Sequence, residues 1–314
     1  MGKYFVSVDG GGTKTEFCVA DIDGNIIKSY IFGSTNYKSV GTEKMFLNLQ
    51  TGLNSIMKNL SMEIEDLSYI VFGISGYDSS LDYDIIYEQI LRLGIPKEKF
   101  HLCNDSLLAF YAQAEEPGIV VISGTGSIVV GIDKKNLLKR AGGWGYYFSD
   151  MGSGYWIGKE LLKRTLLYCD NVHKYSRLFD EVRKHYNARK FEDLPYKITE
   201  ILGFDEIAKF SKLATEFPDD NEWLKRDILQ EGATYLCGLI KNIYDSLDFK
   251  NEDNVNIVFS GSVLKNSLYS GMLKEAVQKE LNATNIVFKK QINAPAFGGI
   301  KLAKRRYKGE LNEK

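Results

Sequence analysis

The sequence has few cysteines, few histidines and no excess of charge, and these shortages exclude several classes of protein. The four cysteines stand singly with no CxxC spacing, which favours buried reduced thiols over disulfides or a zinc site. No HExxH pattern accompanies the three histidines. A formal net charge of −1 gives no overall attraction to nucleic acid or to an anionic membrane. We therefore expect a small-molecule partner.

Long apolar runs are also missing. No run approaches the roughly 20 residues needed to span a bilayer, and the first residues lack the basic, apolar and small-residue tract of a signal peptide. These absences predict a cytoplasmic protein with no membrane partner. At 314 residues, the chain has room for about two domains with their own cores.

Two glycine-rich turns stand out in what is present: VDGGGTKT at 8–15 and ISGTGS at 122–127. Each turn joins two apolar stretches that predict strands, and the order of the parts is the same in both copies. Such turns let backbone N–H groups and Thr or Ser hydroxyls point at anions. A pair of ordinary β-hairpins is the alternative for either turn alone. The repeat favours two hairpins that bind a polyphosphate.

Asp105 follows a short predicted strand at 99–103 and precedes a predicted helix, so two interpretations are open. An Asp at this place commonly caps the helix. Alternatively, Asp105 is a working carboxylate, because ligands of open α/β sheets gather at the carboxyl ends of the strands. The apolar spacing also predicts other elements: helices from about 43 and at 82–93, and a strand buried on both faces at 69–74.

Glycines and aromatic residues alternate densely over 142–158, which predicts neither an ordinary helix nor a regular strand there. The tract either lines a carbohydrate site, where aromatic faces meet sugar rings, or forms a structural corner. Helical patterns then run over 160–248 as an insertion. A strand at 255–259, a small-residue turn at 260–263 and a helix at 264–281 follow, and the turn is a plausible seat for an adenosine. A strand at 286–288 and a terminal helix from 295 complete the chain.

Taken in order, these motifs resemble the actin, Hsp70 and sugar kinase superfamily, and within it the N-acetylglucosamine kinase branch related to the BadF/BcrA ATPases. The motifs that carry the resemblance span nearly the whole chain: 9–15, 34–36, 104–105, 123–127, 142–156, 260–262 and 294–303. The resemblance implies an α/β fold of two ribonuclease-H-like (actin-like ATPase) domains around a cleft. They would cover 1–115 and 116–295, with the helix 296–314 returning to the first and the insertion 160–248 in the second.

The resemblance also implies an ATP-dependent kinase that phosphorylates the 6-hydroxyl of N-acetylglucosamine, N-acetylmuramic acid or both, with Mg²⁺, in a cleft that closes on the sugar. No Walker A sequence occurs, so the hairpins would bind the phosphates instead. Asp105 would be the base and Asp9 would hold Mg²⁺. The nucleotide contacts implied are Gly11, Gly12, Thr13, Lys14, Thr125, Gly126, Gly261 and Ser262. The sugar contacts implied are Asn36, Asp105, Gly143, Trp144, Gly145 and Asp150.

Other functions remain open from the sequence: a glucosamine kinase, an ATPase that activates a reductase or dehydratase, and a sugar sensor that has lost catalysis. The activators hold an iron–sulfur cluster through cysteines beside the second turn, where this chain has Ile128, Val129 and Val130. Lys38 either pairs with the lactyl carboxylate of N-acetylmuramic acid or is a solvated lysine. A homodimer is implied by the resemblance alone.

Overall fold

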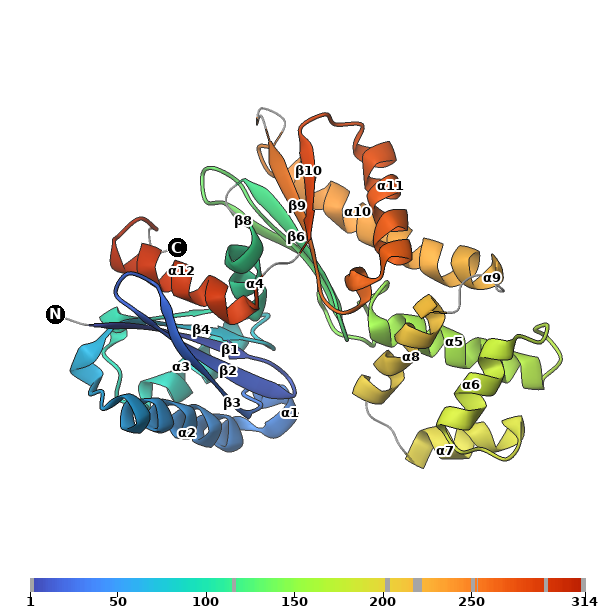
Figure 1. Cartoon of the computed structure of the whole chain (residues 1–314), viewed down its shortest axis with the longest axis horizontal. Coiled ribbons are helices and arrows are strands. Elements are labelled where there is room, and N and C mark those ends of the chain that lie inside the picture. Colours follow the sequence, from blue (N-terminus) through green and yellow to red (C-terminus); the bar gives the residue numbers. More distant parts are fainter. Residues whose placement is uncertain are drawn as a thin grey trace. The chain divides into compact units, whose positions relative to one another are not determined.

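The computed structural model describes residues 3–114, 117–200, 204–216, 222–249, 252, 254–290 and 293–311 (Figure 1). The chain divides into two compact units. Unit 1 comprises Met1–Glu115 and Ile292–Lys314, and unit 2 comprises Glu116–Gln291. No helix of the described residues is long and apolar enough to cross a membrane.

Unit 1 is built on a five-stranded sheet of order β3-β2-β1-β4-β5. The hairpin strands β1, β2 and β3 run antiparallel, whereas β4 and β5 are parallel to β1. The strands are β1 (Tyr4–Gly10), β2 (Lys14–Asp21), β3 (Ile26–Gly33), β4 (Leu67–Ile74) and β5 (Phe100–Cys103). The helices are α1 (Tyr37–Val40), α2 (Thr42–Leu60), α3 (Ser80–Leu91), α4 (Asp105–Gln113) and α12 (Pro295–Tyr307), with short 3-10 turns η1 (Ile64–Asp66) and η2 (Lys97–Lys99).

Unit 2 repeats this topology in its sheet, whose order is β10-β9-β6-β7-β8. Its strands are β6 (Gly118–Ser123), β7 (Ser127–Ile132), β8 (Leu138–Gly142), β9 (Val255–Ser260) and β10 (Ile286–Lys290). The helices inserted between β8 and β9 are α5 (Gly154–Cys169), α6 (Arg177–His185), η3 (Phe191–Asp193), α7 (Leu194–Glu200), α8 (Phe204–Glu216), α9 (Glu222–Leu224), the π-helical turn η4 (Lys225–Leu229) and α10 (Gln230–Ser246). The turn η5 (Val263–Lys265) and the helix α11 (Ser267–Leu281) follow β9.

The repeat predicted from two glycine turns extends to all five strands of each sheet, because β6 to β10 occupy the places of β1 to β5. Even the turn after the second strand is the same in both units. The carboxylate of Asp21 accepts the amide hydrogens two and four residues on, from Asp23 and Asn25. Asp133 does the same for Lys135 and Leu137. The predicted α/β class with paired sheets is confirmed.

Each unit has its own apolar core, and strand alternation divides the first one between two faces. Val6 and Val8 join one core cluster with buried residues of α2, such as Leu49. Ser7 points the opposite way, toward α12, where a Cβ on Gly299 would come within 1.9 Å of its hydroxyl. Figure 1 accordingly shows α2 and α12 on opposite faces of this sheet. The predicted helix from about 43 and the buried strand at 69–74 are confirmed as α2 and β4.

The prediction for the glycine–aromatic tract was wrong in its second half. Residues from Gly154 onward form α5, which Ser153 caps by accepting the amide hydrogen of Trp156. Glycine is tolerated at the start of this helix because α8 packs directly on it. A Cβ on Gly158 would lie 2.0 Å from the carbonyl oxygen of Ile207.

The helix predicted at 264–281 begins later than its apolar pattern suggested. A 3-10 turn over 263–265 comes first, and Asn266 caps α11 by accepting the amide hydrogen of Tyr269 at 3.0 Å. The small-residue turn at 260–263 therefore does not open the helix directly. Helix α7 lies within the helical region predicted over 160–248.

Candidate functional site

Asp9 and Asp105 lie at the same edge of the unit 1 sheet. Parallel pairing places Asp9 opposite Gly73, and Gly73 opposite Cys103, so the ends of β1, β4 and β5 are level. Asp105 follows two residues after Cys103, as the first residue of α4. Adjacent strands lie about 4.8 Å apart, so two inter-strand steps separate β1 from β5. Gly73 of β4 lies between these two strands and has no side chain. A Cβ on Gly73 would lie 2.4 Å from the Leu108 side chain of α4.

Asp105 does not cap α4, so that interpretation of its position is wrong. The cap is Asn104, whose side-chain oxygen accepts the amide hydrogen of Ser106 at 3.0 Å. The side-chain nitrogen of Asn104 donates to the carbonyl oxygen of Tyr77 at 2.8 Å. Asn104 is thus fixed by two elements, and Asp105 is presented in the first turn of the helix.

Burial, and after it the nearby carboxylates of Asp105 and Glu16, raise the pKa of Asp9 to about 7, against a lowering effect from Lys14. Two carboxylates that disfavour each other's charge form a site that a cation stabilises. No group of three or more His, Cys, Asp or Glu side chains among the described residues could hold a metal by itself. A cation here would need further ligands from a bound molecule.

The first glycine turn is braced by the segment after β3. Within the turn, the amide of Gly11 donates to the carbonyl oxygen of Lys14 at 2.9 Å. The hydroxyl of Ser34 donates to the carbonyl oxygen of Gly11 at 2.9 Å. A Cβ on Gly12 would meet nothing within 4 Å, so a ligand can approach the backbone there. Thr13 follows in the turn, and Lys14 is the first residue of β2.

Asn36 stands at the end of that bracing segment and caps the short helix α1, its oxygen accepting the amide hydrogen of Lys38 at 3.0 Å. Gly76 packs against the Asn36 side chain so closely that a Cβ there would lie 2.8 Å from the same oxygen. Gly76 also has a φ of +85°, which favours glycine. Asn36 is therefore held in one place.

The loop between β4 and α3, residues 75–79, was missed in the sequence. Its Ser75 amide donates to the carbonyl oxygen of Gly10 at 2.8 Å. Gly76 lies against Asn36, and Tyr77 accepts the bond from Asn104. One loop therefore joins three predicted parts of the site. The only sequence signal was a Gly-Tyr-Asp run directly after a buried strand.

Lys38 is partly exposed and forms two ion pairs within unit 1. Its ammonium lies 3.1 Å from Asp78 and 3.0 Å from Asp82. The carboxylate of Asp82 is buried and also accepts hydrogen bonds from the hydroxyls of Tyr37 and Ser79. Although burial opposes it, these bonds hold the pKa of Asp82 well below its usual range.

The second glycine turn gathers several predicted residues of unit 2. The carbonyl oxygens of Gly124 and Thr125 accept the amides of Gly154 and Tyr155 at 2.7 and 3.1 Å, which ties the turn to the start of α5. Asp150 is buried with a φ of +62°, and a Cβ on Gly126 would lie 2.7 Å from its carboxylate. The structure therefore places Asp150 against the hairpin.

Gly261 joins this group, because its backbone packs on β6. It has a φ of +95°, and a Cβ there would lie 2.3 Å from the carbonyl oxygen of Ser123. Ser262 is the next residue and immediately precedes η5. The predicted adenosine seat and the second hairpin are thus in contact within unit 2.

The glycine–aromatic loop after β8 is exposed at its tip. Gly143 and Gly145 have φ of +71° and +95°, which turn the chain on both sides of Trp144. The Trp144 ring is 64% exposed and lies 4.5 Å from the Arg140 guanidinium. Phe148 is 93% exposed. Aromatic surface at this loop is available to a ligand.

A model of the BadF/BadG/BcrA/BcrD ATPase family matches residues 6–303. The chain belongs to this family. It is similar to an N-acetylmuramic acid/N-acetylglucosamine kinase of Clostridium acetobutylicum, with 29% sequence identity. The match covers 96% of this chain and 98% of that kinase. An N-acetyl-D-glucosamine kinase of Dictyostelium discoideum is 26% identical over 96% of this chain and 98% of its own.

Among solved structures, a putative N-acetylglucosamine kinase from Chromobacterium violaceum superposes with a TM-score of 0.69, at 20% identity and with 96% and 99% of the two chains covered. At that identity the likeness concerns the fold, and it confirms the two-domain α/β fold of the actin-like ATPases. Membership of the BadF/BadG/BcrA/BcrD ATPase family implies the use of ATP.

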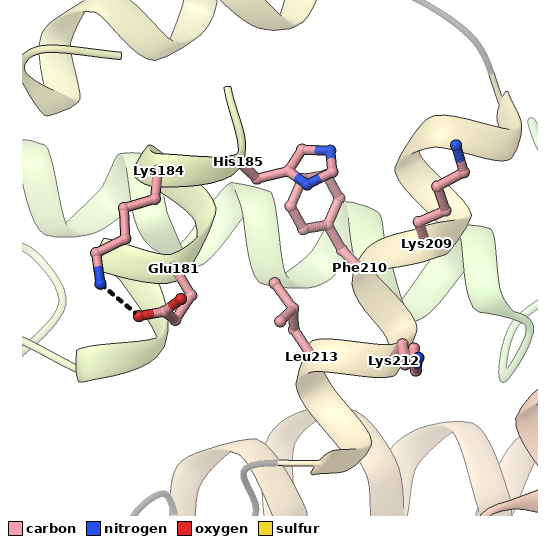
Figure 2. A pocket seen from close by; sticks show the side chains of 7 residues that line it. All are labelled: Glu181, Lys184, His185, Lys209, Phe210, Lys212 and Leu213. Atoms are coloured by element: carbon pink, nitrogen blue, oxygen red, sulfur yellow. Dashed lines mark hydrogen bonds and ion pairs between the residues drawn. The ribbon is translucent and has the colours of Figure 1, made fainter. Parts of the chain in front are cut away.

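This family member also has a pocket of about 390 Å³ between α6 and α8 of the insertion (Figure 2). His185 and Phe210 stack edge to face beside Leu213, and Lys184 pairs with Glu181 at 2.8 Å. None of the predicted site residues lines it. The pocket is therefore a feature of the insertion and not of the two hairpins.

Proposed function

We propose that the protein is an ATP-dependent kinase of N-acetylated amino sugars, transferring the γ-phosphate to the 6-hydroxyl of N-acetylglucosamine, N-acetylmuramic acid or both. The proposal rests on one observation: Asp9 and Asp105 lie at the same edge of the sheet, and Asn104, not Asp105, caps α4. The similar kinases of Clostridium and Dictyostelium support the same reaction class.

The two glycine turns are assigned to the nucleotide. The first turn can bind phosphate oxygens, because the backbone at Gly12 is open to a ligand and the hydrogen bond from Gly11 to Lys14 fixes the turn. The residues assigned are Gly11, Gly12, Thr13 and Lys14 in unit 1, and Thr125, Gly126, Gly261 and Ser262 in unit 2. Gly261 and Ser262 are assigned to the adenosine side.

The donor set at Asp9 fits Mg²⁺. This ion commonly binds through one or two carboxylates, substrate phosphates and water, and a raised pKa at Asp9 marks a place where added positive charge is favourable. Mg²⁺, when bound with the nucleotide, would neutralise negative charge on the phosphates. Asp9 would hold it through water and thereby position the phosphates in front of Asp105.

Asp105 is assigned as the general base. Its carboxylate accepts the proton of the sugar 6-hydroxyl while that oxygen forms a bond to the γ-phosphorus. The bond between the γ-phosphorus and the oxygen bridging to the β-phosphate breaks, and ADP leaves with that electron pair. Phosphoryl transfer depends mainly on positioning and charge stabilisation, and a positioned base adds typically about 10²–10⁴ in rate.

The remaining residues are assigned to the sugar. Asn36 and Asp105 belong to unit 1, where the 75–79 loop ties their surroundings together. In unit 2 the assigned residues are Gly143, Trp144, Gly145 and Asp150. The exposed Trp144 ring offers an apolar face to a sugar ring. A cytoplasmic homodimer completes the proposal, and light scattering and cell fractionation test it.

The test is a coupled assay of ADP formation with Mg·ATP and a panel of sugars: N-acetylglucosamine, N-acetylmuramic acid, glucosamine, N-acetylmannosamine and glucose. We expect turnover with one or two N-acetylated sugars and none above the blank with glucose. Turnover of glucosamine alone would make it a glucosamine kinase. ADP formation that no sugar stimulates would contradict the proposal.

A further inference from the structure

A compact charged cluster surrounds Lys38 beside the predicted sugar residues of unit 1. Its ammonium is shared between the carboxylates of Asp78, at 3.1 Å, and Asp82, at 3.0 Å. Tyr37 and Ser79 donate hydroxyl hydrogens to Asp82, and the amide of Asp78 donates to it at 3.0 Å. One positive and two negative side chains leave the cluster with a net charge of −1.

The cluster is attached to both predicted sugar-binding residues of this unit. Lys38 donates its backbone amide to the side chain of Asn36 at 3.0 Å. Asp78 is adjacent to Tyr77, whose carbonyl oxygen holds Asn104, the residue before Asp105. A sugar held by Asn36 and Asp105 would therefore lie close to this negative charge.

We propose that the Lys38, Asp78 and Asp82 cluster makes the sugar site select uncharged N-acetylated amino sugars over those with a carboxylate, such as the lactyl group of N-acetylmuramic acid. The inference rests on the proposed kinase function and specifies its substrate. A lactyl carboxylate that approached Lys38 would compete with the carboxylates of Asp78 and Asp82 for its ammonium. The negative charges of Asp78 and Asp82 would also repel it.

The size of the effect is set by exposure. The Lys38 and Asp78 side chains are 43% and 28% exposed, so solvent screens the repulsion in part. We expect a preference for N-acetylglucosamine over N-acetylmuramic acid of about tenfold in kcat/KM at low salt. Added salt screens the repulsion and reduces the preference.

The experiment measures kcat/KM for both sugars in the wild-type protein and in Asp78→Asn, with Asp84→Asn as the matched control. Asp84 is an exposed residue of α3, outside the cluster. Asp78→Asn removes one negative charge and leaves Lys38 paired with Asp82. The preference is expected to fall several-fold in Asp78→Asn and to stay at the wild-type value in Asp84→Asn.

A second measurement needs no variant: the wild-type preference, followed as potassium chloride is raised, is expected to decline. Equal kcat/KM for the two sugars in the wild-type protein, or a preference that neither salt nor Asp78→Asn changes, would overturn this inference while leaving the kinase proposal intact. Turnover of no sugar at all would overturn the kinase proposal and this inference with it.

Discussion

Asp9 lies level with Cys103, the last residue of β5, and Asp105 follows two residues after that strand end. Burial and the negative charge of the Asp105 carboxylate raise the pKa of Asp9 to about 7. Mutual repulsion of this kind costs stability in the free protein, and a bound cation with phosphates relieves it. Functional sites commonly carry such strain. Variants of these two residues therefore separate the cost of the repulsion in stability from its use in catalysis.

Replacing Asp105 by Asn is expected to lower kcat by about 10²–10⁴, because the base for the sugar hydroxyl is lost. Nucleotide affinity should change little, since the glycine turns are untouched. Steady-state assays and titration with a fluorescent nucleotide measure the two quantities. Asp84→Asn serves as the control. A loss in kcat smaller than tenfold would show that Asp105 is not the base.

Asp9→Asn is expected to stabilise the free protein above neutral pH while abolishing activity. The folded pKa of Asp9, about 7, lies well above the ordinary pKa of an aspartate. The stability that the protonated carboxyl of Asp9 contributes is fully present below about pH 4 and is lost as the pH rises through 7. Melting temperatures should differ by several degrees at pH 8 and little at pH 4. A variant less stable than wild type at pH 8 would contradict this account of Asp9.

His101 is expected to give the opposite pH dependence. Burial, and after it the charge of Arg306, lowers its pKa to about 3, and Arg306 donates to its Nε2 at 3.3 Å. Neutral His101 therefore contributes stability above pH 6.5 that is lost as pH falls toward 3, by up to about 1.4 kcal/mol per pH unit. In urea titrations His101→Gln should flatten the wild-type loss of stability between pH 6.5 and 4. A His101→Gln variant that loses stability over this pH range as steeply as the wild type would contradict the account.

Gly298→Ala is expected to destabilise unit 1 by about 1–3 kcal/mol or more, because overpacking against backbone cannot relax easily. A Cβ at Gly298 of α12 would lie 1.9 Å from the carbonyl oxygen of Leu108 and 2.4 Å from the amide of Ala112. Gly271→Ala in α11 is the matched control, since a Cβ there meets nothing within 4 Å. The control should gain up to about 1 kcal/mol from helix propensity. Equal effects of the two changes, measured in urea titrations, would refute the close packing of α4 and α12.

The paired hairpins, the amphipathic α2 and the placement of Asp105 at a strand end were predictable, because each depends on short-range pattern. The cap of α4 was not, since Asn104 and Asp105 are adjacent and both residue types cap helices. The pairing of Lys38 with Asp78 joins residues 40 positions apart, beyond the reach of local pattern. The first turn of α5 was not predicted, because its glycines are accommodated by contacts with α8, such as Gly158 against Ile207, that only the fold brings together.

The most direct measurement of the central claim is the product of a single reaction. The protein is incubated with Mg·ATP and N-acetylglucosamine, and phosphorus–proton correlation NMR is recorded as ADP accumulates. We predict one new phosphate monoester coupled to the protons at carbon 6, in an amount equal to the ADP formed. Formation of ADP together with inorganic phosphate and no sugar phosphate, or of a phosphate ester on another carbon, would contradict the account.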